Sequence, residues 1–188
     1  MAYIPRDELQ EMGFAHLGEN VKISTRAALY ECDKMSIGSN SRIDDFCLLS
    51  GRITIGRNVH IAAYSNVAGG VEGVEFADFS GLAYGCHILS QSDDYSGGSM
   101  TNPTVPERFK HETKQRVYIG RHVIVGTCSI VFPGVALAEG TSVGAHAVVT
   151  KSTEPWSIYI GSPARRIRER RRDLLRYEQE YLDEGSSQ

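Results

Sequence analysis

The chain has 188 residues, and its 23 acidic and 20 basic residues give a formal net charge of −3. This length suits one domain with a substantial core, and a negative balance without aromatic residues interleaved among the arginines disfavours nucleic acid as a partner. The hydrophobic fraction of 41% is typical of a globular chain, and no apolar run approaches the ~20 residues of a membrane span. The first residues carry no secretion signal, so we expect a cytoplasmic protein.

Residues 1–12 predict a short helix. Pro5 stands near the expected first turn, and the acidic residues Asp7 and Glu8 follow it, which is the arrangement that a helix N-terminus favours. We expect this segment to cap the open lower end of the main domain, which we assign to residues 13–168.

An aliphatic residue recurs every six positions through most of that domain. The sixteen positions that share this spacing, in two runs, are Leu17, Ile23, Leu29, Ile37, Ile43, Leu49, Ile55, Ile61, Val67 and Val74, then Ile119, Val125, Val131, Leu137, Val143 and Val149. A small residue often follows the aliphatic one, as in Ile37-Gly38, Ile55-Gly56 and Val143-Gly144.

A period of six matches neither the 3.6 residues of a helical turn nor the alternation of a simple strand. It is the period that a three-sided coil requires, with one short strand and one corner per hexad and the aliphatic residue pointing inward. Stacked at about 4.8 Å, such coils would satisfy one another's backbone hydrogen bonds. The sequence therefore predicts an all-β fold, a triangular prism of parallel strands, over an irregular β-sandwich.

Two segments depart from this period and are candidates for function. Residues 90–117 form a polar, glycine-rich excursion of the kind that is usually functional or disordered in a compact domain. Residues 169–188 follow as a charged helix, expected from Glu169 to Leu182, and a tail. The six arginines between Arg165 and Arg172 either form a solvated helix surface or bind an anion.

Cysteine and histidine spacing argues against a disulfide framework and against a metal. Cys32, Cys47, Cys86 and Cys128 lie far apart without a C-x-x-C pair, so we expect small buried fillers. His60, His87 and His122 would be the candidates for a metal triad like that of the γ-type carbonic anhydrases, but the pair of histidines five residues apart that marks those enzymes is missing. We expect no catalytic metal.

The hexad repeat resembles that of the hexapeptide-repeat acyltransferases, which are left-handed parallel β-helices. Within that family, Val149-Thr150-Lys151 and Gly161-Ser162-Pro163-Ala164-Arg165 look like the end of the acetyltransferases that act on sugars and xenobiotics. The resemblance implies a homotrimer with acetyl-coenzyme A as co-substrate, bound in a groove between two prisms. The residues that it places on coenzyme A are Thr127 and Ala145, through main-chain groups, and Thr150, Lys151, Arg165 and Arg168, at the nucleotide end.

The family resemblance also implies a general base in the excursion, commonly a histidine. This sequence has Asp93 and Asp94 at the matching place, which leaves two alternatives. His87, a few residues earlier, could reach the same cleft, or one of the aspartates could act directly or orient a histidine of a neighbouring subunit. A carboxylate of ordinary pKa is a weak base towards a hydroxyl, so the aspartate alternative suits an amine acceptor better.

The main function that we predict is transfer of an acetyl group from acetyl-coenzyme A to a sugar hydroxyl, with a saccharide or small-molecule acceptor. Transfer to the amino group of a nucleotide-linked sugar is the alternative. A protein related to the γ-type carbonic anhydrases and a scaffold whose arginine helix binds an acidic partner are two further hypotheses of different classes.

Overall fold

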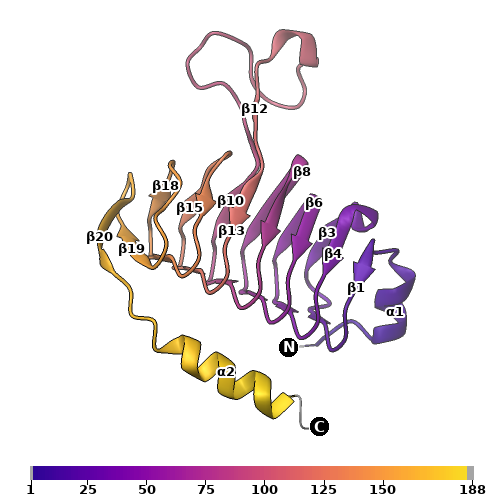
Figure 1. Cartoon of the computed structure of the whole chain (residues 1–188). Helices are drawn as coiled ribbons and strands as arrows, with labels where there is room; N and C mark the ends of the chain where they lie inside the picture. The colour runs from indigo at the N-terminus through magenta and orange to yellow at the C-terminus, as the bar shows by residue number, and fades with distance from the viewer. Residues whose placement is uncertain (1, 186–188) are drawn as a thin grey trace.

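The computed structural model describes residues 2–185, and the chain winds in it as a three-sided coil with one long excursion (Figure 1). The coil is a left-handed parallel β-helix. Face 1 is formed by β2 Lys22–Ile23, β5 Arg42–Ile43, β7 His60–Ile61, β9 Gly81–Leu82, β14 Ile124–Val125, β17 Ser142–Val143, β19 Ser157–Ile160 and β20 Arg165–Glu169.

The other two faces share long strands that bend around one corner. Strands β6 Leu48–Ile55 and β8 Asn66–Phe76 each contribute their second half to face 2 and their first half to face 3. The remaining strands of face 2 are β1 His16–Leu17, β4 Met35–Ile37, β13 Val117–Ile119 and β16 Ala136–Leu137. Those of face 3 are β3 Ala28–Tyr30, β10 His87–Leu89, β15 Ile130–Val131 and β18 Val148–Val149.

The aliphatic positions of the hexads fill the inside of the prism, as predicted. On face 1, Ile43 pairs with Ile61, Ile61 with Leu82, and Leu82 with Val125, so that one buried column crosses successive coils. Only Leu17 and Leu29, in the first coils, are partly exposed. Each inward side chain removes apolar surface from water, and that burial is the main stabilisation available to so thin a prism.

Two corners of the prism carry columns of residues with left-handed backbone. The first, which we call the helix corner, consists of Asn20, Asn40, Asn58, Phe79, His122, Gly140 and Trp156. The second, the open corner, consists of Phe46, Tyr64, Gly85, Cys128 and His146. Positive φ is costly for large side chains but is accessible to Gly and Asn, so the aromatic residues in these columns require a reason beyond backbone preference.

The N-terminal helix α1, Arg6–Glu11, lies against the first coil (Figure 1). Leu9 is buried in the core, and the Arg6 Nη1 donates a hydrogen bond of 2.6 Å to the carbonyl oxygen of Gly18. The segment therefore attaches to the prism through both apolar and polar contacts.

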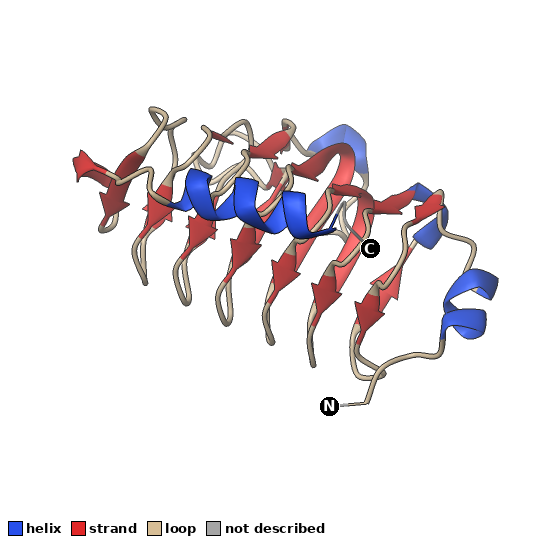
Figure 2. Cartoon of the chain, turned by 60° about the horizontal axis from the view of Figure 1, so that its bottom comes forward, coloured by secondary structure: helices blue, strands red, loops and turns tan. Residues whose placement is uncertain are grey.

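The C-terminal segment reverses direction before it becomes helical. Strand β20 pairs antiparallel with β19, and helix α2 follows at Leu174–Gly185 and runs back across the coils (Figure 2). The helix begins five residues after Glu169, where the sequence predicted it to begin, because Arg165–Glu169 extend the sheet of face 1. On the helix corner, the Tyr181 hydroxyl accepts a hydrogen bond of 2.9 Å from the Asn58 amide, and the Tyr181 ring meets Phe79 edge-on.

No helix within residues 2–185 is long and apolar enough to cross a membrane.

Candidate active site

The excursion leaves the prism after β10 as a two-stranded stalk and returns at β13 (Figure 1). Its stalk consists of β11 Gln91–Ser92 paired antiparallel with β12 Thr113–Lys114, and a short 3-10 turn, Glu107–Phe109, lies near its tip. The backbone N–H of Gln115 donates to the Ser90 carbonyl oxygen at 2.9 Å, which attaches the base of the stalk to face 3. The excursion is thus an ordered arm that projects from the prism.

Asp94 shapes the turn in this arm. One carboxylate oxygen accepts the Ser96 N–H at 2.8 Å, and the other accepts the Ser99 hydroxyl at 3.1 Å. These hydrogen bonds from Ser96 and Ser99 favour the ionised form and lower the pKa of Asp94 to about 2. The structure thus makes Asp94 part of the turn that shapes the arm, and its part in catalysis stays a prediction.

Replacing Asp94 by Ala should therefore loosen the arm without unfolding the prism. We expect trypsin to cleave Asp94→Ala at Arg108 and Lys110 faster than it cleaves the wild type. Asp7→Ala, which removes an exposed carboxylate from α1, is the control and should be cleaved like the wild type. Because the pKa of Asp94 is depressed in the folded protein, its stabilisation of the arm is complete above the ordinary aspartate pKa near ~4 and is lost as the pH falls towards 2. Equal cleavage rates in both variants would contradict this role.

Asp93 is less constrained than its neighbour. Its carboxylate accepts one long hydrogen bond, 3.3 Å from the Asn102 N–H. It also lines a cavity of about 290 Å³ together with Tyr95, Pro103 and Glu112. Asp93 is consequently the aspartate of the pair that is available to a ligand.

His87 lies on the outer surface of face 3, at the start of β10. It pairs with Asn66 of β8 on one side and with Ile130 of β15 on the other, and no hydrogen bond engages its ring within residues 2–185. The Oδ1 atom of Asn66 is buried and has no hydrogen-bond partner among the same residues. Such an orphaned acceptor is costly, so a donor from outside the chain would stabilise this surface.

His87 and the aspartates lie on different parts of the fold, His87 on β10 of the prism and Asp93 and Asp94 in the arm. Six residues of mostly extended chain separate His87 from Asp93, a span of up to about 20 Å. The arm moreover projects away from the prism (Figure 1). That His87 reaches the same cleft as the aspartates stays a prediction.

The expected coenzyme residues fall into two groups. Thr127 and Ala145 stack one coil apart beside the open corner, where the Thr127 carbonyl oxygen accepts the His146 N–H at 2.8 Å. Arg165 lies near the same corner, because the preceding Ala164 N–H bonds the Val148 carbonyl at 2.8 Å.

Thr150 and Lys151 follow the far end of β18, at another corner of the prism. Arg168 is exposed in β20, and its guanidinium makes no hydrogen bond within the described part of the chain. The structure therefore aligns Thr127, Ala145 and Arg165 along one edge and places Thr150 and Lys151 elsewhere.

A charged cluster on face 1 was missed by the sequence analysis. The Arg42 guanidinium donates to both oxygens of Asp44, at 2.7 and 2.9 Å, and the His60 Nε2 lies 2.9 Å from the same carboxylate. Burial alone would raise the pKa of Asp44, but the hydrogen bonds from Arg42 and His60 outweigh it and hold that pKa below its ordinary value. The cluster joins two adjacent coils, and the 18-residue spacing of Arg42 and His60 is the signal that predicts their proximity.

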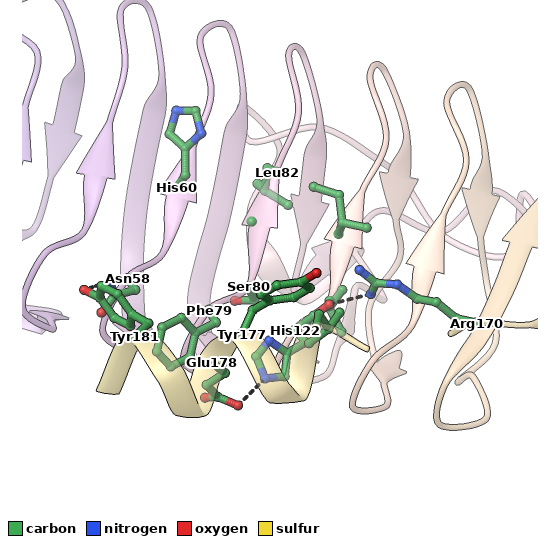
Figure 3. A pocket seen from close by; sticks show the side chains of 14 residues that line it. Asn58, His60, Phe79, Ser80, Leu82, His122, Arg170, Tyr177, Glu178 and Tyr181 are labelled. Carbon is green, nitrogen blue, oxygen red and sulfur yellow. Dashed lines mark hydrogen bonds and ion pairs between the residues drawn. The ribbon is translucent and has the colours of Figure 1, made fainter. Parts of the chain in front are cut away.

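A second cluster attaches α2 to the helix corner and borders a cavity of about 580 Å³ (Figure 3). The His122 Nε2 lies 2.8 Å from a Glu178 oxygen, and Arg121 pairs with the other oxygen of Glu178. Arg170 donates to the His122 carbonyl oxygen at 2.6 Å and to that of Gly140 at 3.1 Å. Burial, with smaller effects from Arg121 and Arg170, lowers the pKa of His122.

The three histidines considered for a metal triad therefore lie in three different places. His60 contacts Asp44 on face 1, His122 contacts Glu178 at the helix corner, and His87 stands on face 3. Within residues 2–185, no group of three or more His, Cys, Asp or Glu side chains is arranged to hold a metal ion. Of the cysteines, Cys47 and Cys86 are buried as expected, whereas Cys128 is exposed at the open corner.

Known proteins share both the repeat and the whole fold. Residues 34–69 match the family model described as bacterial transferase hexapeptide (six repeats). A curated dTDP-4-amino-4,6-dideoxy-D-glucose acyltransferase from Escherichia coli is 44% identical over 181 residues, which cover 95% of this chain and 94% of that protein.

Two kinds of solved structure are similar to this chain. AntD, an N-acyltransferase from Bacillus cereus, was solved with dTDP and 3-hydroxybutyryl-CoA; it is 41% identical, with a TM-score of 0.97 and 98% of each chain covered. A variant of AntD, in complex with dTDP-4-amino-4,6-dideoxyglucose and coenzyme A, has a TM-score of 0.96 and 42% identity over 97% of this chain and 98% of that one. A maltose O-acetyltransferase from Clostridium difficile 630 is similar in fold alone, with 18% identity and a TM-score of 0.56 over 89% of this chain and 75% of that one.

Proposed function

The chain belongs to the hexapeptide-repeat acyltransferase family, and from that premise we propose that it acylates the amino group of a dTDP-linked 4-amino sugar. It is an acyl-coenzyme A-dependent acyltransferase. The observation that carries the choice of acceptor is the similarity over nearly the full length, at more than 40% identity, to a dTDP-4-amino-4,6-dideoxy-D-glucose acyltransferase and to an N-acyltransferase solved with that amino sugar nucleotide bound.

The prediction of a sugar hydroxyl as acceptor is wrong. The relatives with high identity are an acyltransferase of a 4-amino sugar nucleotide and an N-acyltransferase, whereas the O-acetyltransferase shares only the fold. The sequence alone could not separate the two chemistries, because the aliphatic positions that identify the family are buried inside the prism and carry no information on the acceptor.

The reaction forms an amide bond and breaks a thioester bond. The neutral amine attacks the thioester carbonyl, the resulting oxyanion collapses, coenzyme A leaves as its thiolate, and the nitrogen loses a proton. An amine acceptor would also suit an aspartate as the base, but Asp94 is held in the turn by Ser96 and Ser99. We assign the proton to His87, since histidine is the commonest base near neutral pH, and we assign Asp93 to hold the amino group. Asp94 keeps the turn that presents Asp93.

We propose that these assignments use two copies of the chain. His87 lies on the prism and Asp93 on the arm that projects from it, and the Asn66 acceptor beside His87 has no donor within residues 2–185. An arm reaching the face 3 of a neighbour would supply both needs. We therefore propose a homotrimer with a site between each pair of prisms, and sedimentation velocity tests its stoichiometry.

The donor lies along the open corner in this proposal. The main chain at Thr127 and Ala145 binds the pantetheine arm, and Arg165 and Arg168 bind the phosphates at the C-terminal end of the prism. We propose an acetyl group as the acyl group, and 3-hydroxybutyryl-coenzyme A, the ligand found with AntD, is the comparison donor.

Replacing Arg165 and Arg168 together by Ala should raise the KM for acyl-coenzyme A by about tenfold per lost charged hydrogen bond and change kcat little. Arg171→Ala is a matched control, because Arg171 is exposed and pairs with Asp173. Steady-state kinetics with the donor varied measures both values. An unchanged KM in the double variant would remove these two arginines from the donor site.

The proposed function is tested by coenzyme A release with two acceptors that differ in one group. We expect turnover with dTDP-4-amino-4,6-dideoxyglucose, and at least a hundredfold slower turnover with the dTDP sugar that carries a hydroxyl at the same carbon, since a site built around an amine discriminates strongly against its analogue. Equal rates, or turnover with the hydroxyl sugar only, would overturn the proposal.

A further inference from the structure

The open corner carries a stack of side chains that ends abruptly. The Arg26 guanidinium lies 5.7 Å from the centre of the Phe46 ring, and the Phe46 and Tyr64 rings are stacked with centres 5.1 Å apart and an interplanar angle of 21°. Backbone bonds from Phe46 to Arg26 and from Tyr64 to Asp45 place these residues on successive coils. Arg26 and Tyr64 therefore lie on opposite sides of Phe46.

The next position in the column is Gly85, which has no side chain. The Gly85 N–H bonds the Ala63 carbonyl oxygen at 3.0 Å, which puts Gly85 one coil above Tyr64. A Cβ atom built on Gly85 would meet, among the described residues, only the Cys128 Sγ at 3.3 Å. One face of the Tyr64 ring is thus left open, and the space up to Cys128 spans two coils, about 10 Å, which is enough for one planar ring stacked on Tyr64.

The two corners differ in what covers their aromatic residues. At the helix corner, Phe79 stacks on His122 and meets Tyr181 of α2, so the chain itself covers that column. At the open corner, Phe46 is 48% exposed and Tyr64 is 63% exposed, although positive φ disfavours large side chains at both positions. Backbone strain of this kind is retained where function requires it.

We propose that the open face of Tyr64, above Phe46 and below Cys128, stacks against the thymine base of the acceptor. The inference rests on the proposed function and names the part of the acceptor that this surface holds. A pyrimidine is flat and aromatic, so it continues a stack of flat rings at the spacing that Phe46 and Tyr64 already show.

The position of the gap agrees with the rest of the site. Gly85 lies one coil from Cys128, and Cys128 follows Thr127, where we place the pantetheine arm. Gly85 also lies two residues before His87. The acceptor would therefore lie on the N-terminal side of the donor along the same edge. Tyr64 and Gly85 are positioning residues in this account, because they hold the nucleotide and take no part in proton transfer.

Two variants test the proposal from opposite directions. Tyr64→Ala removes the stacking surface and should weaken dTDP binding by about 5- to 150-fold, the range for loss of one base stacked on an aromatic ring. Gly85→Asn fills the gap with a residue that tolerates positive φ and should weaken dTDP binding similarly. Tyr30→Ala, which replaces a similarly exposed tyrosine outside the stack, is the control and should bind dTDP like the wild type.

The measurements are calorimetric titrations of each variant with dTDP and, separately, with coenzyme A, and sedimentation velocity. We expect both site variants to lose dTDP affinity, to bind coenzyme A as the wild type does, and to raise the KM for the acceptor more than they lower kcat. Unchanged dTDP affinity in Tyr64→Ala would overturn the proposal while the wild type still acylates the amino sugar. A changed oligomeric state instead assigns the stack to a subunit contact and also overturns it.

If the wild type binds no dTDP and acylates no dTDP sugar, the proposed function fails and the inference fails with it. If the wild type is active but Tyr64→Ala and Gly85→Asn bind dTDP as tightly as Tyr30→Ala does, the inference alone fails. The two failures are thus distinguishable in one set of titrations.

Discussion

His87→Ala should lower kcat by about 10²- to 10⁴-fold, the contribution typical of a positioned general base, while acyl-coenzyme A binds as before. The reason is that the attacking nitrogen must lose a proton, and His87 is an exposed imidazole without a hydrogen-bond partner within residues 2–185. Stopped assays of coenzyme A release measure kcat, and calorimetry measures donor binding.

His16→Ala is the matched control for that experiment. His16 is an exposed histidine at the start of β1, on face 2 of the first coil, and its loss should change neither quantity. Added imidazole should restore part of the lost rate in His87→Ala, which a purely structural defect would not allow. A kcat within twofold of the wild type would exclude His87 as the base.

Arg170→Met should lower the free energy of unfolding by about 2 to 4 kcal/mol, because a charged donor is lost and the backbone carbonyls that it served remain partly buried. The Arg170 Nη1 donates to the carbonyl oxygens of His122 and Gly140, at 2.6 and 3.1 Å. Burial lowers the pKa of this guanidinium, but an arginine stays charged at neutral pH.

Urea unfolding followed by circular dichroism measures that loss. Arg171→Met is the comparison, since the Arg171 side chain is 88% exposed and forms only a surface pair with Asp173, a contact worth little. We expect it to stay within about 0.5 kcal/mol of the wild type. Equal stability of the two variants would show that the hydrogen bonds from Arg170 to the helix corner do not stabilise the fold.

The prism was predictable because each hexad by itself determines which of its residues points inward. A narrow three-sided coil admits one inward aliphatic side chain per strand, so Ile43, Ile61 and Val125 had to stack in one column once the period was recognised. The parts that the sequence described less well depend on contacts between distant residues. The helix was expected to begin at Glu169, but pairing of Arg165–Glu169 with β19 delays it to Leu174.

The candidate site shows the same division. Asp93 and Asp94 look equivalent in the sequence, and only the hydrogen bonds from Ser96 and Ser99 assign Asp94 to the turn. His87 is close to both aspartates in sequence, yet an extended strand carries the chain away from it. The choice of an amine over a hydroxyl lies outside the hexads altogether and came from similarity over the whole chain.

In the proposed trimer, each active site uses His87 of one copy and the arm of another, and mixing two inactive variants is the direct test of that sharing. His87→Ala and Asp93→Ala, coexpressed with different tags and purified as mixed oligomers, should regain about a third of the wild-type rate, because each mixed trimer holds one intact interface of its three. A mixed oligomer no more active than either variant alone would contradict a site shared between copies.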